Sequence, residues 1–242
     1  MITILLKEIN EFLDSLIAYV VIGIFLTGTG LLMWIFPDTN VLDYGYASME
    51  TVFSLGPYVF MFLIPAITMK SFAEEKRAGT IELLYTLPFR DLDIIAGKFF
   101  AGFILVILSV LPTIIYYFSL YYLGNPVGNV DTAGIVGSYV GLVLLGGIFT
   151  ALGVFSSALT GNQIVSFMLA AFLCFALYAG LDSIASINIW SETSYTISQI
   201  GILPHYETLS KGLVDFGDVA YFVSMIVLIL YFTRIVLNVQ RK

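Results

Sequence analysis

Charged side chains are scarce in this chain. Only 11% of its 242 residues are charged and 59% are hydrophobic, and the mean hydropathy is +0.97. An ordinary soluble domain is about 25% charged and about 45–50% apolar. The polar side chains are therefore too few to cover a water-soluble particle of this size, which argues against a soluble enzyme and a disordered chain. The class that remains is a membrane protein that crosses the bilayer several times.

Cysteine and histidine are almost absent. The single cysteine, Cys174, lies in an apolar run, and the single histidine is His205. One of each cannot build a disulfide framework, a zinc or haem site, or a serine–histidine pair within the membrane. The chain also lacks the G-x-x-x-x-G-K-[ST] loop that binds ATP. We therefore expect no catalytic residue, metal or cofactor in this chain, and energy for uphill transport must come from another subunit.

Long stretches without charge mark the expected membrane spans. They cover residues 15–37, 51–69, 99–130, 132–181 and 219–233. A helix of about 20 apolar residues crosses the bilayer, so the fourth stretch has room for two helices. We predict an all-α polytopic membrane protein with six transmembrane helices, at about 16–36, 52–70, 97–123, 134–159, 163–186 and 217–238.

The basic residues indicate the orientation of these spans. With six spans, both termini and the loop at 71–96 share one side, and nine of the ten basic residues lie there. Only Lys211 falls on the other side. The positive-inside rule then places the termini and this loop in the cytoplasm. Residues 1–15 are amphipathic and should lie along the inner leaflet, and the outer loop at 187–216 should hold short helices.

The few polar and small residues near the spans carry further expectations. No span centre holds an ionisable residue, which disfavours an ion-coupled carrier or a charge-selective channel. Lys98 and Arg234 lie near the inner ends of spans three and six, where their side chains can extend to the interface. In span four, small residues allow close helix packing within the chain or in a dimer: Gly137, Gly141 and Gly147.

The loop at 71–96 is the most informative polar stretch. A charged end is followed by a glycine that suits a helix C-terminus and a threonine that suits the start of a new helix. An acidic residue then lies in the first turn, and a proline stops the helix. In order, these residues are Glu74, Glu75, Lys76, Arg77, Gly79, Thr80, Glu82 and Pro88. Such a helix suits docking onto a cytoplasmic partner, and the same pattern suits a plain amphipathic loop.

The order of these residues resembles the signature of ABC-2-type transporter permeases. The pattern is Glu-Lys-Arg-x-Gly-Thr-x-Glu-Leu-Leu, followed by Pro88 and Gly97-Lys98, between spans two and three. Arg90 departs from it, since the family often has a small residue there. The resemblance covers nearly the whole chain and implies a cytoplasmic coupling helix whose residues are the eight named above. It also implies a cytoplasmic ABC ATPase dimer that binds ATP and Mg, and a place in the bacterial inner membrane with no nucleic-acid partner.

Within that family, the chain is most similar to the gliding-motility permeases of Bacteroidota. The similar stretches are 40–48, 62–66, 71–84, 124–129 and 205–212. This implies an exporter linked to gliding motility or the associated secretion. Its membrane partner would be a second permease or membrane subunit with a large extracytoplasmic domain, or a second copy of the chain. Two other hypotheses stay open: a structural membrane anchor that uses the ATPase cycle without moving a substrate, and an ATP-independent channel or carrier.

Overall fold

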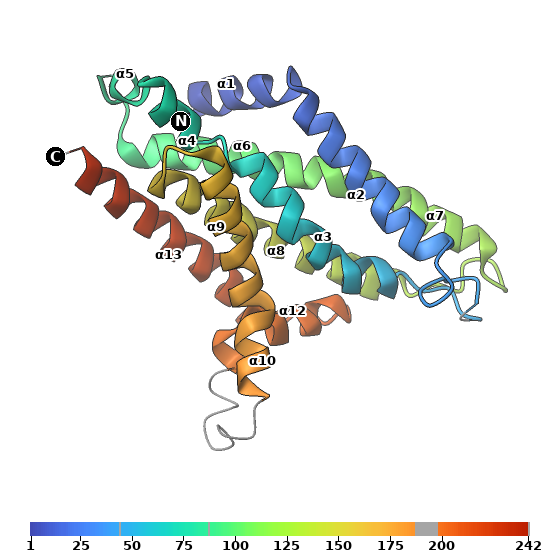
Figure 1. Cartoon of the computed structure of the whole chain (residues 1–242). Coiled ribbons are helices and arrows are strands. Elements are labelled where there is room, and N and C mark those ends of the chain that lie inside the picture. The colour runs from blue at the N-terminus through green and yellow to red at the C-terminus, as the bar shows by residue number, and fades with distance from the viewer. Residues whose placement is uncertain (44, 87, 187–197, 242) are drawn as a thin grey trace.

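The computed structural model describes residues 1–43, 45–86, 88–186 and 198–241, and these form helices without any strand (Figure 1). Much of the outer loop predicted to hold short helices, residues 187–197, lies outside this description. The helices are α1 Ile2–Leu13, α2 Leu16–Trp34, α3 Glu50–Thr68, α4 Ala73–Ala78, α5 Ile81–Thr86, α6 Asp91–Val110, the 3-10 turn η1 Leu111–Thr113, α7 Ile114–Leu123, α8 Thr132–Leu159, α9 Gln163–Phe175, the π-helical turn η2 Ala176–Gly180, α10 Leu181–Ala185, α12 Ile202–Ser210 and α13 Phe216–Gln240. The predicted all-α class is confirmed.

Five helical segments among the described residues are long and apolar enough to cross a membrane. They are 50–78, 91–123, 132–159, 163–185 and 216–240. The number reaches the expected six when the bent pair 2–13 and 18–34, whose axes meet at 67°, is taken as one broken span. In the third span, Pro112 lies in the 3-10 turn that joins α6 to α7, because proline cannot donate the helical hydrogen bond. The chain is therefore a multi-pass helical membrane protein.

Helix α8 lies at the centre of the bundle. In its apolar stretch 78% of the residues are buried, against 22% in the span that contains α9 and 17% in α13. Helices α3, α6, α9, α12 and α13 all pack against it. Its glycines permit this, since a Cβ built at Gly153 would lie 1.8 Å from the Thr68 hydroxyl oxygen of α3, and one at Gly146 would lie 2.6 Å from Val106 of α6. Small residues thus bring the neighbouring backbones close, as is common in membrane bundles.

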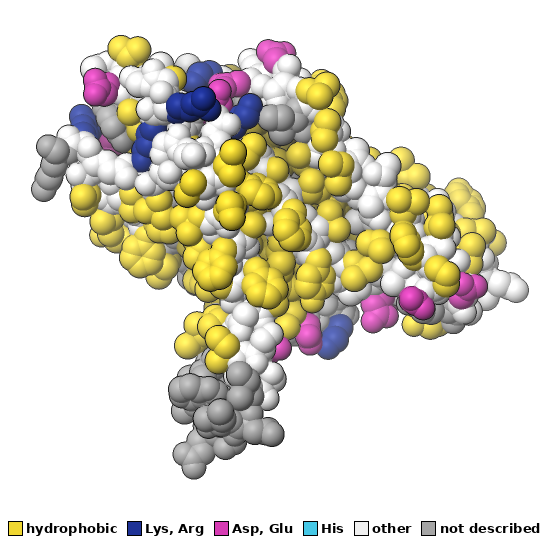
Figure 2. All heavy atoms as spheres, viewed as in Figure 1, with side chains coloured by type: hydrophobic (Ala, Val, Ile, Leu, Met, Phe, Trp, Pro, Cys, Tyr) yellow, Lys and Arg dark blue, Asp and Glu magenta, His cyan; other side chains and the backbone are white. Residues whose placement is uncertain are grey.

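The two ends of the bundle differ in charge (Figure 2). One end carries both termini, α4 and α5, and most of the basic side chains gather there; we call it the basic end. The opposite end carries the loops around 35–49 and 124–131 and shows mainly acidic side chains; we call it the acidic end. A broad hydrophobic surface separates them, as expected for a bilayer-spanning protein.

A second, smaller hydrophobic core lies at the basic end, apart from the main core of the bundle. It joins residues of α1, α6, α8 and α13 with the chain just before α4, and α5 packs against it through Leu84. Its buried members are Ile4, Phe72, Ile94, Ile95, Val154, Ala158 and Leu237. The loop at 71–96 therefore packs against a hydrophobic core that is separate from the main core of the bundle.

Candidate functional site

The chain turns sharply between α3 and α4, and one serine of α8 holds this turn. The Ser157 hydroxyl accepts hydrogen bonds from the backbone N–H groups of Phe72 (2.9 Å) and Ala73 (3.0 Å) and donates one to the carbonyl of Met69 (3.1 Å). A hydroxyl has one donor and two acceptor sites, so all three are used. Sequence reasoning missed Ser157 because it lies 85 residues from Phe72 and no local pattern marks it.

Helix α4 ends as its sequence predicts. Gly79 has φ = 69°, the left-handed conformation that glycine adopts without steric cost. Its N–H donates to the carbonyl of Lys76 (3.3 Å), and the N–H of Thr80 donates to the carbonyl of Glu75 (3.0 Å). This is the Schellman pattern. The Thr80 hydroxyl, which we expected to cap α5, donates instead to the carbonyl of Glu75 (3.4 Å). Helix α5 ends at Thr86, before Pro88.

The four consecutive charges of α4 divide into an inner and an outer pair. Glu74 and Arg77 are exposed, whereas Glu75 and Lys76 are partly buried. The Lys76 ammonium donates to the carbonyl of Ala158 at the end of α8 and to the side chain of Gln240 at the end of α13. The inner pair thus fixes α4 to the bundle, and only the outer pair is free to meet another molecule.

Lys98 of α6 is the centre of a buried ion cluster. Its ammonium donates to the carboxylates of Glu8 in α1 (2.8 Å) and Glu75 in α4 (2.9 Å), and it lies 5.1 Å from the centre of the Phe72 ring. The side chain is only 2% exposed, so the expectation that it extends to the interface is wrong. Two carboxylates within hydrogen-bonding distance offset much of the cost of removing the ammonium from water.

Helix α1 is not a free interfacial helix. Ile4, Glu8 and Phe12 recur every fourth residue and are all buried, so they form one face of the helix. This face packs on α6, where a Cβ built at Gly97 would lie 2.9 Å from Ile4. A neighbouring face keeps large apolar residues exposed, at Ile2, Leu6 and Leu13. Helix α1 can therefore bind the bundle with one face and the leaflet with another.

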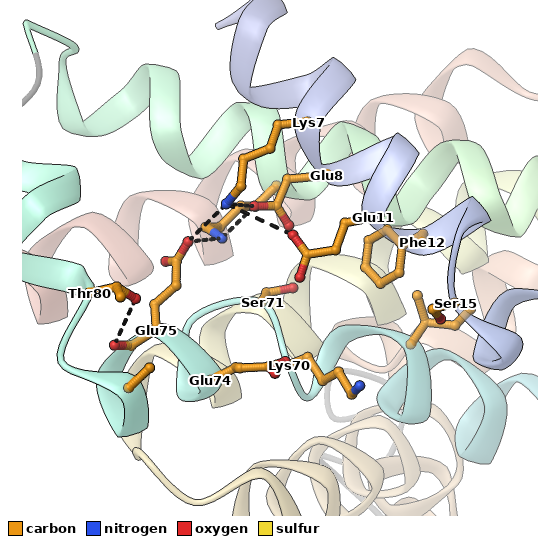
Figure 3. Close-up of a pocket in the computed structure, with 13 residues that line it drawn as sticks. Lys7, Glu8, Glu11, Phe12, Ser15, Lys70, Ser71, Glu74, Glu75 and Thr80 are labelled. Atoms are coloured by element: carbon orange, nitrogen blue, oxygen red, sulfur yellow. Dashed lines mark hydrogen bonds and ion pairs between the residues drawn. The ribbon is translucent and has the colours of Figure 1, made fainter.

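A cleft of about 200 Å³ lies between α1 and the α3–α4 turn (Figure 3). Figure 3 shows Lys7 and Glu8 of α1 and Glu75 of α4 turned toward one another across it. Lys7 lies 3.7 Å from each of these two carboxylates. The lining residues are Lys7, Glu8, Glu11, Phe12, Ser15, Ile67, Lys70, Ser71, Glu74, Glu75, Ala78, Thr80 and Lys98. The structure thus brings part of the predicted coupling sequence together with α1, which sequence reasoning had kept apart.

The three glycines singled out in span four lie against other segments of the same chain. A Cβ at Gly137 would lie 2.7 Å from the Gly212 carbonyl oxygen, one at Gly141 2.6 Å from Leu209, and one at Gly147 2.9 Å from Ile226. All three glycines are buried. They are occupied by intramolecular packing and are not available to a second copy.

His205 has a structural setting at the acidic side of the bundle. Its ring nitrogens lie 2.7 Å from the Asp218 carboxylate and 3.0 Å from the Gln199 carbonyl, and the ring stacks on Tyr221. These contacts hold α12 against α13. Over the part of the chain that the structure describes, no group of three or more His, Cys, Asp or Glu side chains could hold a metal ion.

Fold and site together define a multi-pass helical membrane protein that presents a braced pair of short helices at its basic end. A family model described as ABC-2 family transporter protein matches residues 2–239, and the chain belongs to that family. Such a protein is the membrane transport subunit and is not itself catalytic, and membership implies an ABC ATPase partner in general. A search of curated proteins found none that is significantly similar to this chain.

Proposed function

We propose that the chain is the permease subunit of an ABC transporter and that its ATPase subunit docks on the outer surface of α4 and α5. The basic end, with both termini, then faces the cytoplasm of a bacterial inner membrane. ATP and Mg belong to the ATPase, which is expected to work as a dimer. The observation that carries the proposal is the division of the loop at 71–96 into residues anchored in the bundle and residues left outside.

The outward residues form what we call the coupling face, made of Arg77, Glu82 and Leu83. All three are exposed, and Leu83 is 66% exposed although it is a large apolar side chain on a helix outside the expected spans. Leu84, beside it, packs on the small core. An exposed apolar side chain with charged residues on the same short segment resembles the apolar core and polar rim of protein interfaces. The coupling face therefore suits a partner protein.

The anchored residues supply a route for motion. Glu75 of α4 accepts a hydrogen bond from Lys98 of α6, and the same lysine binds Glu8 of α1. Lys76 of α4 binds the ends of α8 and α13, and Ser157 of α8 holds the turn before α4. A displacement of the coupling face would be transmitted through these contacts to four other helices, α1, α6, α8 and α13. A plain amphipathic loop needs no such bracing, so the arrangement favours the docking hypothesis over that alternative.

The proposal is tested by placing a charge at Leu83. Leu83→Asp should abolish co-purification of a Walker-loop ATPase from native membranes and the stimulation of its ATP hydrolysis. Leu213→Asp is the matched control, because Leu213 is 64% exposed and lies in the short segment between α12 and α13. Equal ATPase recovery with the two variants would overturn the proposal.

The finer assignment is an exporter linked to gliding motility or the associated secretion. It is supported by the resemblance of residues 40–48, 62–66, 71–84, 124–129 and 205–212 to gliding-motility permeases. It predicts a second membrane subunit with a large extracytoplasmic domain, a second permease, or a second copy of the chain. ATP-dependent uptake of a membrane-derived cargo into inverted vesicles would support an exporter, whereas ATP turnover without any cargo movement would support the structural anchor.

A further inference from the structure

The cleft between α1 and the α3–α4 turn is lined by two charged side chains that form no ion pair among the described residues. Among the ion pairs between described residues, none involves Lys70 or Glu74. Figure 3 shows the Lys70 ammonium directed away from the ion cluster. The cleft therefore offers an uncompensated cation and an uncompensated anion at the same time.

The cleft also has an excess of carboxylate. Its lining contains four acidic residues, Glu8, Glu11, Glu74 and Glu75, and three basic ones, Lys7, Lys70 and Lys98. One oxygen of Glu75, Oε2, is buried and has no hydrogen-bond partner. A buried acceptor without a donor is unfavourable and adds to the negative potential around the cleft, and the excess of one carboxylate favours a cationic N–H group there.

The position of the cleft indicates where its occupant comes from. Two apolar residues, Phe12 and Ile67, also line it, and the exposed apolar residues of α1 lie on the same helix as Phe12. Figure 2 shows the charged side chains of the basic end directly above the hydrophobic surface. This is the level at which lipid headgroups meet the hydrocarbon region.

We propose that this cleft binds the headgroup of a zwitterionic phospholipid. The phosphate would pair with Lys70, and the primary ammonium would pair with Glu74. A phosphate and an ammonium on one molecule match both unused charges, whereas a basic side chain from the ATPase subunit would leave Lys70 unpaired. The inference does not depend on the ATPase contact, because every residue that it uses belongs to this chain.

Native mass spectrometry of the purified full chain tests the proposal, with phosphatidylethanolamine and phosphatidylglycerol added separately. We expect the first lipid to be retained about tenfold more, because phosphatidylglycerol has the phosphate but no ammonium. Glu74→Gln should remove this preference, and Lys70→Gln should lower retention of both lipids. Lys211→Gln and Asp215→Asn make the same changes of charge at the acidic end and should have no effect.

Two results would overturn the proposal. Equal retention of the two lipids, unchanged by Glu74→Gln, would show that the cleft has no headgroup site. In an Ala78→Cys variant, which changes a residue that lines the cleft and takes no part in the proposed contacts, protection from a maleimide by the ATPase subunit but not by phosphatidylethanolamine would assign the cleft to a basic side chain of the partner. Neither result would contradict the proposal that the ATPase binds the coupling face, which Leu83→Asp tests separately.

Discussion

Lys98 of α6 donates a 2.8 Å hydrogen bond to Glu8 of α1, and both side chains are buried although 90 residues separate them in the chain. The same ammonium binds Glu75 of α4. One lysine therefore joins the N-terminal helix, the third span and the loop that carries the coupling face. These three elements should move as one body.

Removal of this ammonium is expected to destabilise the protein strongly. Lys98→Met removes the buried cation and leaves the carboxylates of Glu8 and Glu75 with only the more distant, exposed Lys7 ammonium, 3.7 Å from each. Breaking a buried ion pair in this way costs about 3–5 kcal/mol. Lys211→Met is the control, since its pair with Glu207 is exposed and such pairs contribute about 0–1 kcal/mol. Thermal unfolding of the two variants in detergent measures the difference, and equal melting temperatures would contradict the buried cluster.

A triple variant in which the three side chains of the buried ion cluster are replaced by neutral ones provides a second test. Glu8→Gln and Glu75→Gln combined with Lys98→Met neutralise all three side chains that meet at the buried ammonium, and only the exposed Lys7 beside them keeps its charge. Neutral replacements of buried ion pairs are often tolerated. We expect the triple variant to unfold at a higher temperature than Lys98→Met alone. A triple variant as unstable as the single one would show that packing, and not charge, dominates this site.

Ser157 and its neighbour Ser156 form a matched pair. Both are fully buried, yet the Ser157 hydroxyl bonds three backbone groups, whereas that of Ser156 has no hydrogen-bond partner. Ser157→Ala should therefore cost about 1–3 kcal/mol for each backbone group left unpaired, and Ser156→Ala should cost little. Unfolding in detergent compares them directly. The coupling of the loop would also weaken in Ser157→Ala, which ATPase stimulation would report.

Gly153 sets the distance between α8 and α3. A Cβ there would lie 1.8 Å from the Thr68 hydroxyl oxygen and 2.7 Å from its Cβ, so Gly153→Ala forces the helices apart. Overpacking of this kind typically costs about 1–3 kcal/mol. At Gly28 of α2 nothing lies within 4 Å, so Gly28→Ala should be neutral or slightly stabilising. The contrast in melting temperature would vanish if α8 and α3 were not in close contact.

The orientation of the chain is open to chemical labelling. The native Cys174 is buried, so it should react poorly with a membrane-impermeant maleimide. The Glu82→Cys variant should react only in inverted vesicles, and Lys211→Cys only in right-side-out vesicles or intact cells, as the basic residues predict. The reverse pattern would place the coupling face outside and remove the basis for an ATPase contact.

Much of the fold could be predicted from short stretches of sequence. Helix α2 begins at Leu16 and α9 at Gln163, as predicted from the charge-free stretches, because the length and hydropathy of a span are local properties. The end of α4 at Gly79 was equally predictable, since a left-handed residue after a helix favours glycine. The packing of α1 on α6 was not, because it joins residues far apart in the chain, such as Glu8 and Lys98.

The sequence alone determined the membrane class, the positions of the spans and the place of the charged loop, because each depends on composition within about 20 residues. Only the tertiary structure decided which charges of that loop remain outside. Glu75 points inward because it pairs with Lys98, 23 residues away. Lys76 points inward because it binds Ala158 and Gln240, which lie 82 and 164 residues away. Hydrogen bonds over such separations leave no periodic trace in a sequence, so the coupling face and the cleft emerge only when the helices are packed together.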